Sequence, residues 1–109
     1  MRLPNGAGAI VDIRKLTEYC LNPRHLRGRN KARVFAAVGI TVSDAEELRL
    51  ALLEAARNGA AEPGPTTEYG QRYVVDFELM RRGRLIRLRS AWIVRIGENS
   101  PYLTTCFVL

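Results

Sequence analysis

The sequence has one histidine, two lysines and two cysteines, and no apolar run approaches the roughly 18 residues of a membrane span. It has no P-loop, no GxGxxG and no GxSxG, so the enzyme classes built on these motifs are excluded. With His25 alone, an acid–base mechanism that uses two histidines is excluded too. Cys20 and Cys106 match no metal-ligand spacing, and we expect them to be buried thiols in a reducing cytoplasm.

Other signals are also missing. The amino terminus lacks a charged segment followed by an apolar one, so we predict no secretion signal, no membrane contact and a cytoplasmic location. A metal-dependent nuclease needs clustered carboxylates. Asp76 and Glu78 share one strand face, but their predicted neighbours across the hairpin are arginines. We therefore predict that the protein uses no metal and no cofactor.

Positive charge is abundant and unevenly distributed. The net charge is +6, and all but two of the 17 basic residues are arginine, which binds phosphate bidentately and stacks on bases. Residues 1–40 carry a net charge of +6, residues 41–68 carry −4 and residues 69–109 carry +4. A basic first third favours an anionic partner, most simply nucleic acid.

The strongest local signal is a basic loop over residues 22–33. Asn22-Pro23 opens a turn and Gly28 interrupts the segment, so the loop should be exposed. Lys31 and Arg33 then begin a helix, where cations oppose the helix dipole. Free backbone N–H groups beside these cations would suit a phosphate. A solvated basic loop without a ligand is the simpler alternative.

The first 58 residues are predicted to be mainly helical. Residues 1–8 are a loose lead-in, and residues 9–11 are a short apolar run that suits an edge strand. Asp12 is placed to cap a helix that runs to about Leu21. Small or apolar side chains then recur at helical spacing, at Ile13, Leu16, Thr17 and Cys20.

Two further helices follow the basic loop. The second runs from about Asn30 to Val38, and Gly39 ends it. A capping box from Ser43 to Glu46 begins the third, which runs from Asp44 to about Arg57. Residues 59–67 are rich in Gly, Pro, Ala and Thr and are predicted to be a loop. The expected buried side chains are Val34, Phe35 and Val38 in the second helix, and Leu48, Leu52 and Ala55 in the third.

Residues 68–109 change to a period of two, which is typical of strands. A two-residue turn at Arg82-Gly83 would join two of them in a register where apolar faces apolar and acid faces base. Its pairs are Tyr73 with Trp92, Val75 with Ser90, Asp76 with Arg89, Phe77 with Leu88, Glu78 with Arg87, and Leu79 with Ile86.

A third strand is predicted from Tyr102 to Leu109, and its more apolar face places Leu103, Thr105, Phe107 and Leu109 inward. The sequence thus predicts a single α+β domain. Three N-terminal helices precede a three-stranded or four-stranded antiparallel meander.

Metal-free RNA cleavage is a chemistry that such a chain can support. RNA carries its own nucleophile, the 2′-hydroxyl, so a protein needs only to position it, move protons and stabilise the pentavalent phosphate. His25 can move protons near neutral pH, and Lys31 and Arg33 can neutralise charge. The hydroxyls able to donate to phosphate oxygens are those of Ser90, Thr104 and Thr105.

Further residues can hold the RNA. Arg24, Arg27 and Arg29 suit phosphates, and Tyr73 and Trp92 can stack on bases. Each candidate also has a structural alternative: the histidine as an ordinary loop residue, the aromatic rings as core, and the threonines as strand formers.

A family resemblance rests on several of these segments. Residues 12–23, with His25, Gly28 and residues 31–35, are similar to an uncharacterised bacterial family, domain of unknown function 6883. Residues 69–76, 90–94 and 103–105 extend the resemblance over nearly the whole chain. It implies a toxin-like module encoded beside a small partner. The order of helices before a meander is similar to that of barnase-like, colicin-like and RelE-like ribonuclease toxins.

The chain departs from the family pattern at Leu26, where proline is common, and at Asn30, where histidine is common. The second departure removes a proton-transfer group, so catalysis would depend on His25 and Lys31. We expect a metal-independent ribonuclease, the toxin of a bacterial toxin–antitoxin pair. Its partners would be RNA and a small acidic antitoxin-like protein. The alternative is a non-catalytic module that binds nucleic acid or docks an acidic protein.

Overall fold

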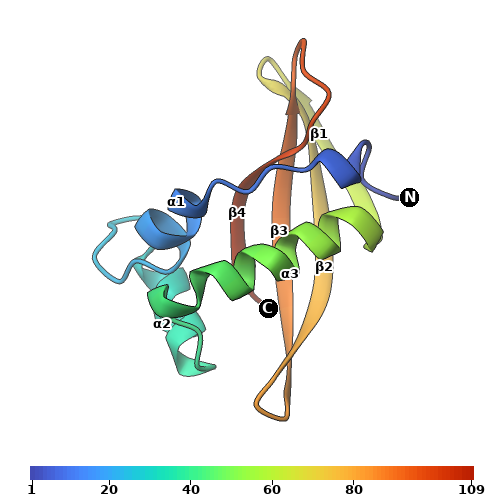
Figure 1. Cartoon of the computed structure of the whole chain (residues 1–109). Helices are drawn as coiled ribbons and strands as arrows, with labels where there is room; N and C mark the ends of the chain where they lie inside the picture. The colour runs from blue at the N-terminus through green and yellow to red at the C-terminus, as the bar shows by residue number, and fades with distance from the viewer.

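The helical half of the chain precedes the sheet, as the change of hydrophobic period predicted, and the α+β class is confirmed (Figure 1). The computed structural model describes all residues from 1 to 109. The sheet has four antiparallel strands in the order β1-β2-β3-β4. The elements are α1 (Ile13–Lys15), α2 (Arg29–Ala37), α3 (Ala45–Asn58), β1 (Ala61–Thr67), β2 (Gly70–Arg81), β3 (Arg84–Arg95) and β4 (Tyr102–Val108).

The β2–β3 hairpin has the predicted register at every predicted pair. Arg82 and Gly83 form the turn, and both have positive φ (52° and 77°), as a type I′ turn requires. Asp76 and Arg89 make a two-pronged ion pair, with N–O distances of 2.7 and 2.9 Å. The register of this hairpin was predictable because the turn residues and the cross-strand pairs indicate the same pairing.

The parity predicted for β4 is wrong beyond Leu103. Leu103 pairs with Trp92 and Thr105 pairs with Ala91, so Thr104 is an extra residue in the strand. Such a bulge moves every later side chain to the other face. Cys106 is therefore buried, whereas Leu109, predicted inward, is 50% exposed. Thr105 and Phe107, also predicted inward, pair with Ala91 and Arg89, which are not inward residues of β3.

Two segments predicted to be irregular are ordered parts of the fold. Residues 61–67 form β1, which pairs with β2 and contains a register shift between Pro63 and Thr66. Proline is tolerated there because β1 is an edge strand and contains an irregularity. In the lead-in, Leu3 is buried in the core, and the amide of Ala61 donates to the carbonyl of Met1. The expected loop at 59–67 and the loose lead-in at 1–8 are thus corrected.

The apolar run 9–11 forms a single bridge rather than a full strand. Ile10 pairs in parallel with Tyr102, and two backbone bonds, to Pro101 and from Leu103, hold it. Ile10 thereby connects the chain before α1 to β4.

The first and third helices begin with side-chain caps. Asp12 caps α1 as predicted, because its carboxylate accepts from the amide of Arg14 at 3.0 Å. The capping box before α3 lies earlier than expected, between Thr41 and Asp44, since a 3₁₀ turn at Val42–Asp44 precedes the helix. The predicted stripe of α3 is buried.

In α2, Phe35 is buried as predicted, but Val34 is 45% exposed and Ala32 is buried instead. Residues 32 and 35 are one helical turn apart, so they share the face toward the core. Gly39 follows α2 with φ of 83° and donates back to Ala36, as a helix-ending glycine does.

The helices cover one face of the sheet, and α3 lies across it (Figure 1). The core lies between these layers and includes Trp92, Leu88 and Val75 from the sheet. From the helical half it includes Leu16, Cys20, Phe35, Leu48 and Leu52. No helix has both the length and the apolar character needed to cross a membrane.

Candidate functional site

A π-helical turn, Leu16–Cys20, continues α1 and carries Tyr19 to the surface beside the basic loop. It is closed by the amide of Leu21, which donates to the carbonyl of Leu16 at 2.8 Å. The helix predicted to run to about Leu21 is therefore present, but residues 16–20 form a π-helical turn instead of an α-helical one. π-turns of this kind are frequent at functional sites.

The basic loop packs directly on Tyr19. The His25 ring meets the Tyr19 ring edge-on, with centroids 4.8 Å apart and planes at 72°. Gly28 lies so close that a Cβ there would be 2.3 Å from the Tyr19 carbonyl oxygen. Only glycine permits this approach.

His25 holds the loop together through one ring nitrogen. Its Nδ1 accepts hydrogen bonds from the amides of Arg27 and Gly28, both at 3.0 Å. A neutral ring that accepts at Nδ1 carries its proton on Nε2, so His25 offers a donor to a ligand rather than a base. His25 therefore also has the structural role of a loop residue, because its ring stabilises the loop through these two hydrogen bonds.

Lys31 is directed at Tyr19 from α2. Its Nζ donates to the Tyr19 hydroxyl at 3.2 Å and lies 5.3 Å from the ring centroid. The side chain is half-buried and forms no ion pair with a carboxylate. An ammonium without a carboxylate partner is available to an anion that enters beside Tyr19.

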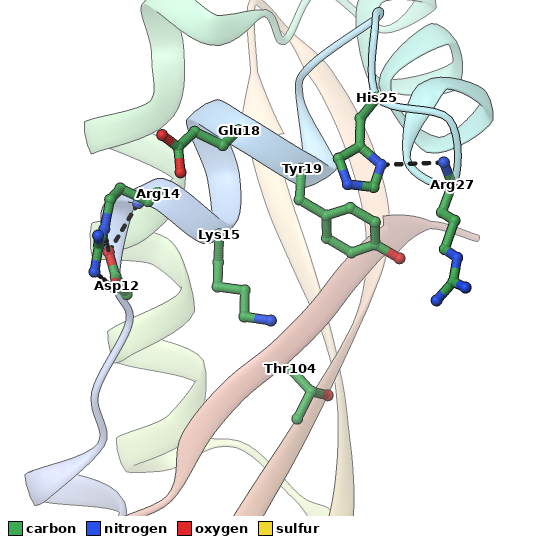
Figure 2. Close-up of a pocket in the computed structure, with 8 residues that line it drawn as sticks. All are labelled: Asp12, Arg14, Lys15, Glu18, Tyr19, His25, Arg27 and Thr104. Carbon is green, nitrogen blue, oxygen red and sulfur yellow. Dashed lines mark hydrogen bonds and ion pairs between the residues drawn. The ribbon is translucent and has the colours of Figure 1, made fainter.

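A surface pocket of about 670 Å³ opens at this point, and we call it the Tyr19 pocket (Figure 2). Lys15, Tyr19 and Arg27 extend to the same side of α1 as Thr104, whereas Glu18 points away from Tyr19. At the rim, hydrogen bonds from Arg14 lower the pKa of Asp12 to about 2, so this carboxylate stays ionised and paired. The lining residues are Asp12, Arg14, Lys15, Glu18, Tyr19, His25, Arg27 and Thr104.

Two buried thiols lie behind the pocket. Cys20 follows Tyr19 in the π-turn, and Cys106 lies in β4; neither forms a disulfide. A hydrogen bond with the Cys106 thiol lowers the pKa of Cys20, while the same contact and burial raise the pKa of Cys106. Thr105 Oγ1 lies 3.8 Å from Cys20 Sγ, so this hydroxyl contacts the thiol pair.

A family model for a domain of unknown function, DUF6883, matches residues 2–109. The chain belongs to this family. The family membership suggested by the sequence resemblance is confirmed. No curated protein and no solved structure matches the chain.

The DUF6883 fold brings together only part of the predicted site. Tyr19 connects His25 with Lys31, and Arg27 and Thr104 line the same pocket. Arg24, Arg29 and Arg33 are exposed on the loop and α2, and none of them has an acidic partner. By contrast, Arg14, Arg49, Arg81, Arg89 and Arg95 do form ion pairs.

Three predicted contacts lie away from the pocket. Trp92 and Ser90 are fully buried: Trp92 Nε1 donates to the Ser90 hydroxyl at 2.9 Å, and that hydroxyl donates to the Val75 carbonyl at 2.7 Å. They form a satisfied core network and cannot touch a substrate in this fold. Tyr73 also packs against the core. The structural alternatives hold for these aromatic side chains.

Sequence reasoning missed Lys15 and Tyr19 as site residues. They are four residues apart at the start of a helix, which places them on one face, and this spacing was the available signal. The role of Tyr19 depends on the loop that folds over it, which no local pattern reveals. The described chain contains no group of three or more His, Cys, Asp or Glu side chains that could hold a metal ion.

Proposed function

We propose that this DUF6883 domain is a metal-independent ribonuclease that binds an RNA phosphate in the Tyr19 pocket. The observation that carries the proposal is the half-buried Lys31 ammonium, hydrogen-bonded to the Tyr19 hydroxyl and free of any carboxylate. Lys31 contacts the pocket through Tyr19, and the two cations that line it, Lys15 and Arg27, have no ion-pair partner either. A cationic recess of this kind suits a phosphodiester.

The reaction follows from RNA's own chemistry. The 2′-oxygen attacks the adjacent phosphorus and loses its proton to solvent, while the bond from phosphorus to the 5′-oxygen breaks and that oxygen gains a proton. The products are a 2′,3′-cyclic phosphate and a 5′-hydroxyl end. The cations Lys31, Arg27 and Lys15 stabilise the doubly charged pentavalent phosphate more than the singly charged substrate.

His25 contributes a donor in this scheme. Its Nδ1 is occupied by the loop amides, so Nε2–H is the group it can present to a phosphate oxygen. Thr104, whose hydroxyl donates to the Ala91 carbonyl at 3.1 Å, can accept from a ribose hydroxyl on the opposite side of the pocket.

The direct test is purified protein with a defined RNA in EDTA. The proposal expects cleavage in EDTA, a 2′,3′-cyclic phosphate end, and no cleavage at a position whose 2′-hydroxyl is replaced by hydrogen. Lys31→Met should reduce the rate by a factor of about a hundred or more. Arg84→Met, at an exposed and unpaired arginine of the hairpin, is the matched control and should leave the rate unchanged.

The competing function is a module that binds RNA without cutting it. Its signature is a folded protein that retards RNA in EDTA and in magnesium alike and leaves the RNA intact. That result would refute the ribonuclease proposal and favour the binding module.

The same surface suits an acidic protein partner, which a ribonuclease toxin would need. Leu26, at the tip of the basic loop, is 82% exposed between unpaired arginines. Nucleic acid gains little from such a side chain, whereas a protein can bury it among carboxylates. We propose that an acidic antitoxin-like protein covers this loop.

Expression in bacteria tests the toxin role. The wild-type chain should arrest growth and Lys31→Met should not, at equal protein levels. If a partner encoded beside the gene restores growth, Leu26→Glu should abolish that rescue while leaving the arrest intact. Rescue that is unaffected by Leu26→Glu would place the partner elsewhere.

A further inference from the structure

The geometry points to Tyr19 as the proton donor to the 5′-oxygen that leaves, with Lys31 stabilising the phenolate that results. This inference rests on the proposed ribonuclease function and assigns its acid. It leaves His25 the roles of holding the loop against Tyr19 and donating from Nε2, and not that of the acid.

The hydrogen-bond direction at Tyr19 carries the first step. A lysine ammonium can only donate, so the Tyr19 oxygen is the acceptor of the 3.2 Å bond from Lys31. The phenolic proton is thus not used in that bond, and no group of the protein accepts it. It is available to a ligand atom in the pocket.

The same contact favours proton transfer. When Tyr19 gives up its proton, the negative charge appears beside an ammonium that has no carboxylate partner. The interaction is therefore stronger after the transfer than before it, which is the condition for an interaction to accelerate a reaction.

The other groups around Tyr19 suit this step less well. Arg27 does not release its proton. Lys31 points its ammonium at Tyr19 rather than into open space. His25 holds two backbone amides through Nδ1 and keeps the edge of its ring against Tyr19. These contacts position the Tyr19 ring.

The step balances as follows. The O–H bond of Tyr19 breaks and its proton joins the 5′-oxygen as the bond from phosphorus to that oxygen breaks. The electron pair of the broken P–O bond stays on the 5′-oxygen and binds the proton. The phenolate then regains a proton from water, so one turnover leaves the protein unchanged.

A substrate whose leaving 5′-oxygen is replaced by sulfur isolates this step, since a thiolate leaves without a proton. Tyr19→Phe should slow cleavage of ordinary RNA by about a hundredfold or more, the usual contribution of a proton-transfer group. On the sulfur-containing RNA the same variant should approach the wild-type rate. Tyr69→Phe, at a tyrosine 65% exposed in the β1–β2 turn, is the matched control and should be silent on both.

The outcomes separate the two proposals. A wild-type protein that cleaves neither substrate defeats the proposed function. A wild-type protein that cleaves both, with Tyr19→Phe unimpaired on ordinary RNA, defeats the inference alone. Equal losses on both substrates would also overturn it, because Tyr19 would then bind or position rather than protonate. A loss confined to ordinary RNA supports it.

Discussion

His25 is the residue at which position and chemistry can be separated. Asparagine places its side-chain oxygen near the site of Nδ1, so His25→Asn should keep the bonds to the loop amides, whereas His25→Ala removes them. We expect His25→Ala to lower the free energy of unfolding by about 1–2 kcal/mol and His25→Asn to cost less than half of that. Urea denaturation measures both.

The activities of the two variants carry the second half of this prediction. His25→Asn should retain activity within about tenfold of wild type, because the loop and Tyr19 stay in place and only the Nε2–H hydrogen bond to phosphate is lost. A folded His25→Asn protein as inactive as a proton-transfer mutant would show that the ring itself performs the chemistry.

Gly28 is the residue where space is tightest. Its φ is −95°, so alanine meets no backbone strain, and the obstacles are the carbonyl oxygen and ring Cδ1 of Tyr19, at 2.3 and 2.9 Å from a new Cβ. We expect Gly28→Ala to destabilise the protein by about 1–3 kcal/mol, as overpacking does, and to reduce activity by displacing the loop. Gly64→Ala, where the nearest atom would be 3.6 Å away, is the control and should be close to neutral. Thermal unfolding measures the stability of both variants, and equal stability of the two would contradict this prediction.

Among the elements, the β2–β3 hairpin depends on pH through one ion pair. A hydrogen bond from Arg89 lowers the pKa of Asp76. The unfolded chain has an ordinary aspartate pKa near 3.9, so the pair stabilises the fold fully above that value. The stabilisation is lost as pH falls through the lower pKa of the folded state.

Asp76→Asn should therefore cost about 0.5 kcal/mol near neutral pH, as for a partly exposed pair, and the cost should shrink in strong acid. Urea denaturation near pH 7 and near pH 3 measures the difference. Glu78→Gln is the control, because Glu78 lies opposite Arg87 without an ion pair. An equal cost for both variants at both pH values would contradict the assignment.

The elements also show where sequence reasoning succeeds. The hairpin was predictable because its turn and its cross-strand pairs are local and agree with each other. β1 was not, since Pro63 and Pro65 are loop signals and the strand depends on pairing supplied by β2. The parity of β4 failed at Thr104, because a bulge leaves no mark in the alternation of side chains.

The candidate site was likewise predictable from the sequence only in part. The basic loop could be read from composition and turn residues, but its centre, Tyr19, could not. Tyr19 becomes important only when the π-turn holds it half-buried at the surface and His25, Gly28 and Lys31 pack around it. Trp92 and Ser90 were assigned to the site although their strand pattern already placed them on the inward face.

Over the whole molecule, positive charge should matter by location rather than by amount. Arg24 and Arg27 lie on the basic loop, where Arg27 lines the pocket, whereas Arg84 and Arg87 lie on the hairpin, and none of the four has an ion-pair partner. Replacing either pair by glutamine removes the same net charge. For single-stranded RNA, each lost phosphate contact should reduce the slope of log K against log salt by about 0.7.

We expect Arg24→Gln with Arg27→Gln to reduce that slope by about 1.4 and the hairpin pair to leave it nearly unchanged. Titration of a fluorescent RNA at several salt concentrations provides the measurement. Equal reductions for the two pairs would mean that RNA is held by the overall field and not at the Tyr19 pocket.

The bridge between Ile10 and Tyr102 also affects the order in which the parts of the pocket come together during folding. Contacts this distant along the chain form late in folding, and the pocket itself includes Thr104 from the last strand. Until β4 has docked, the helical half has no neighbouring strand to complete the pocket. Under the proposed function, a chain in which only the helical half has folded would leave RNA intact, and cleavage would begin once β4 has docked beside α1.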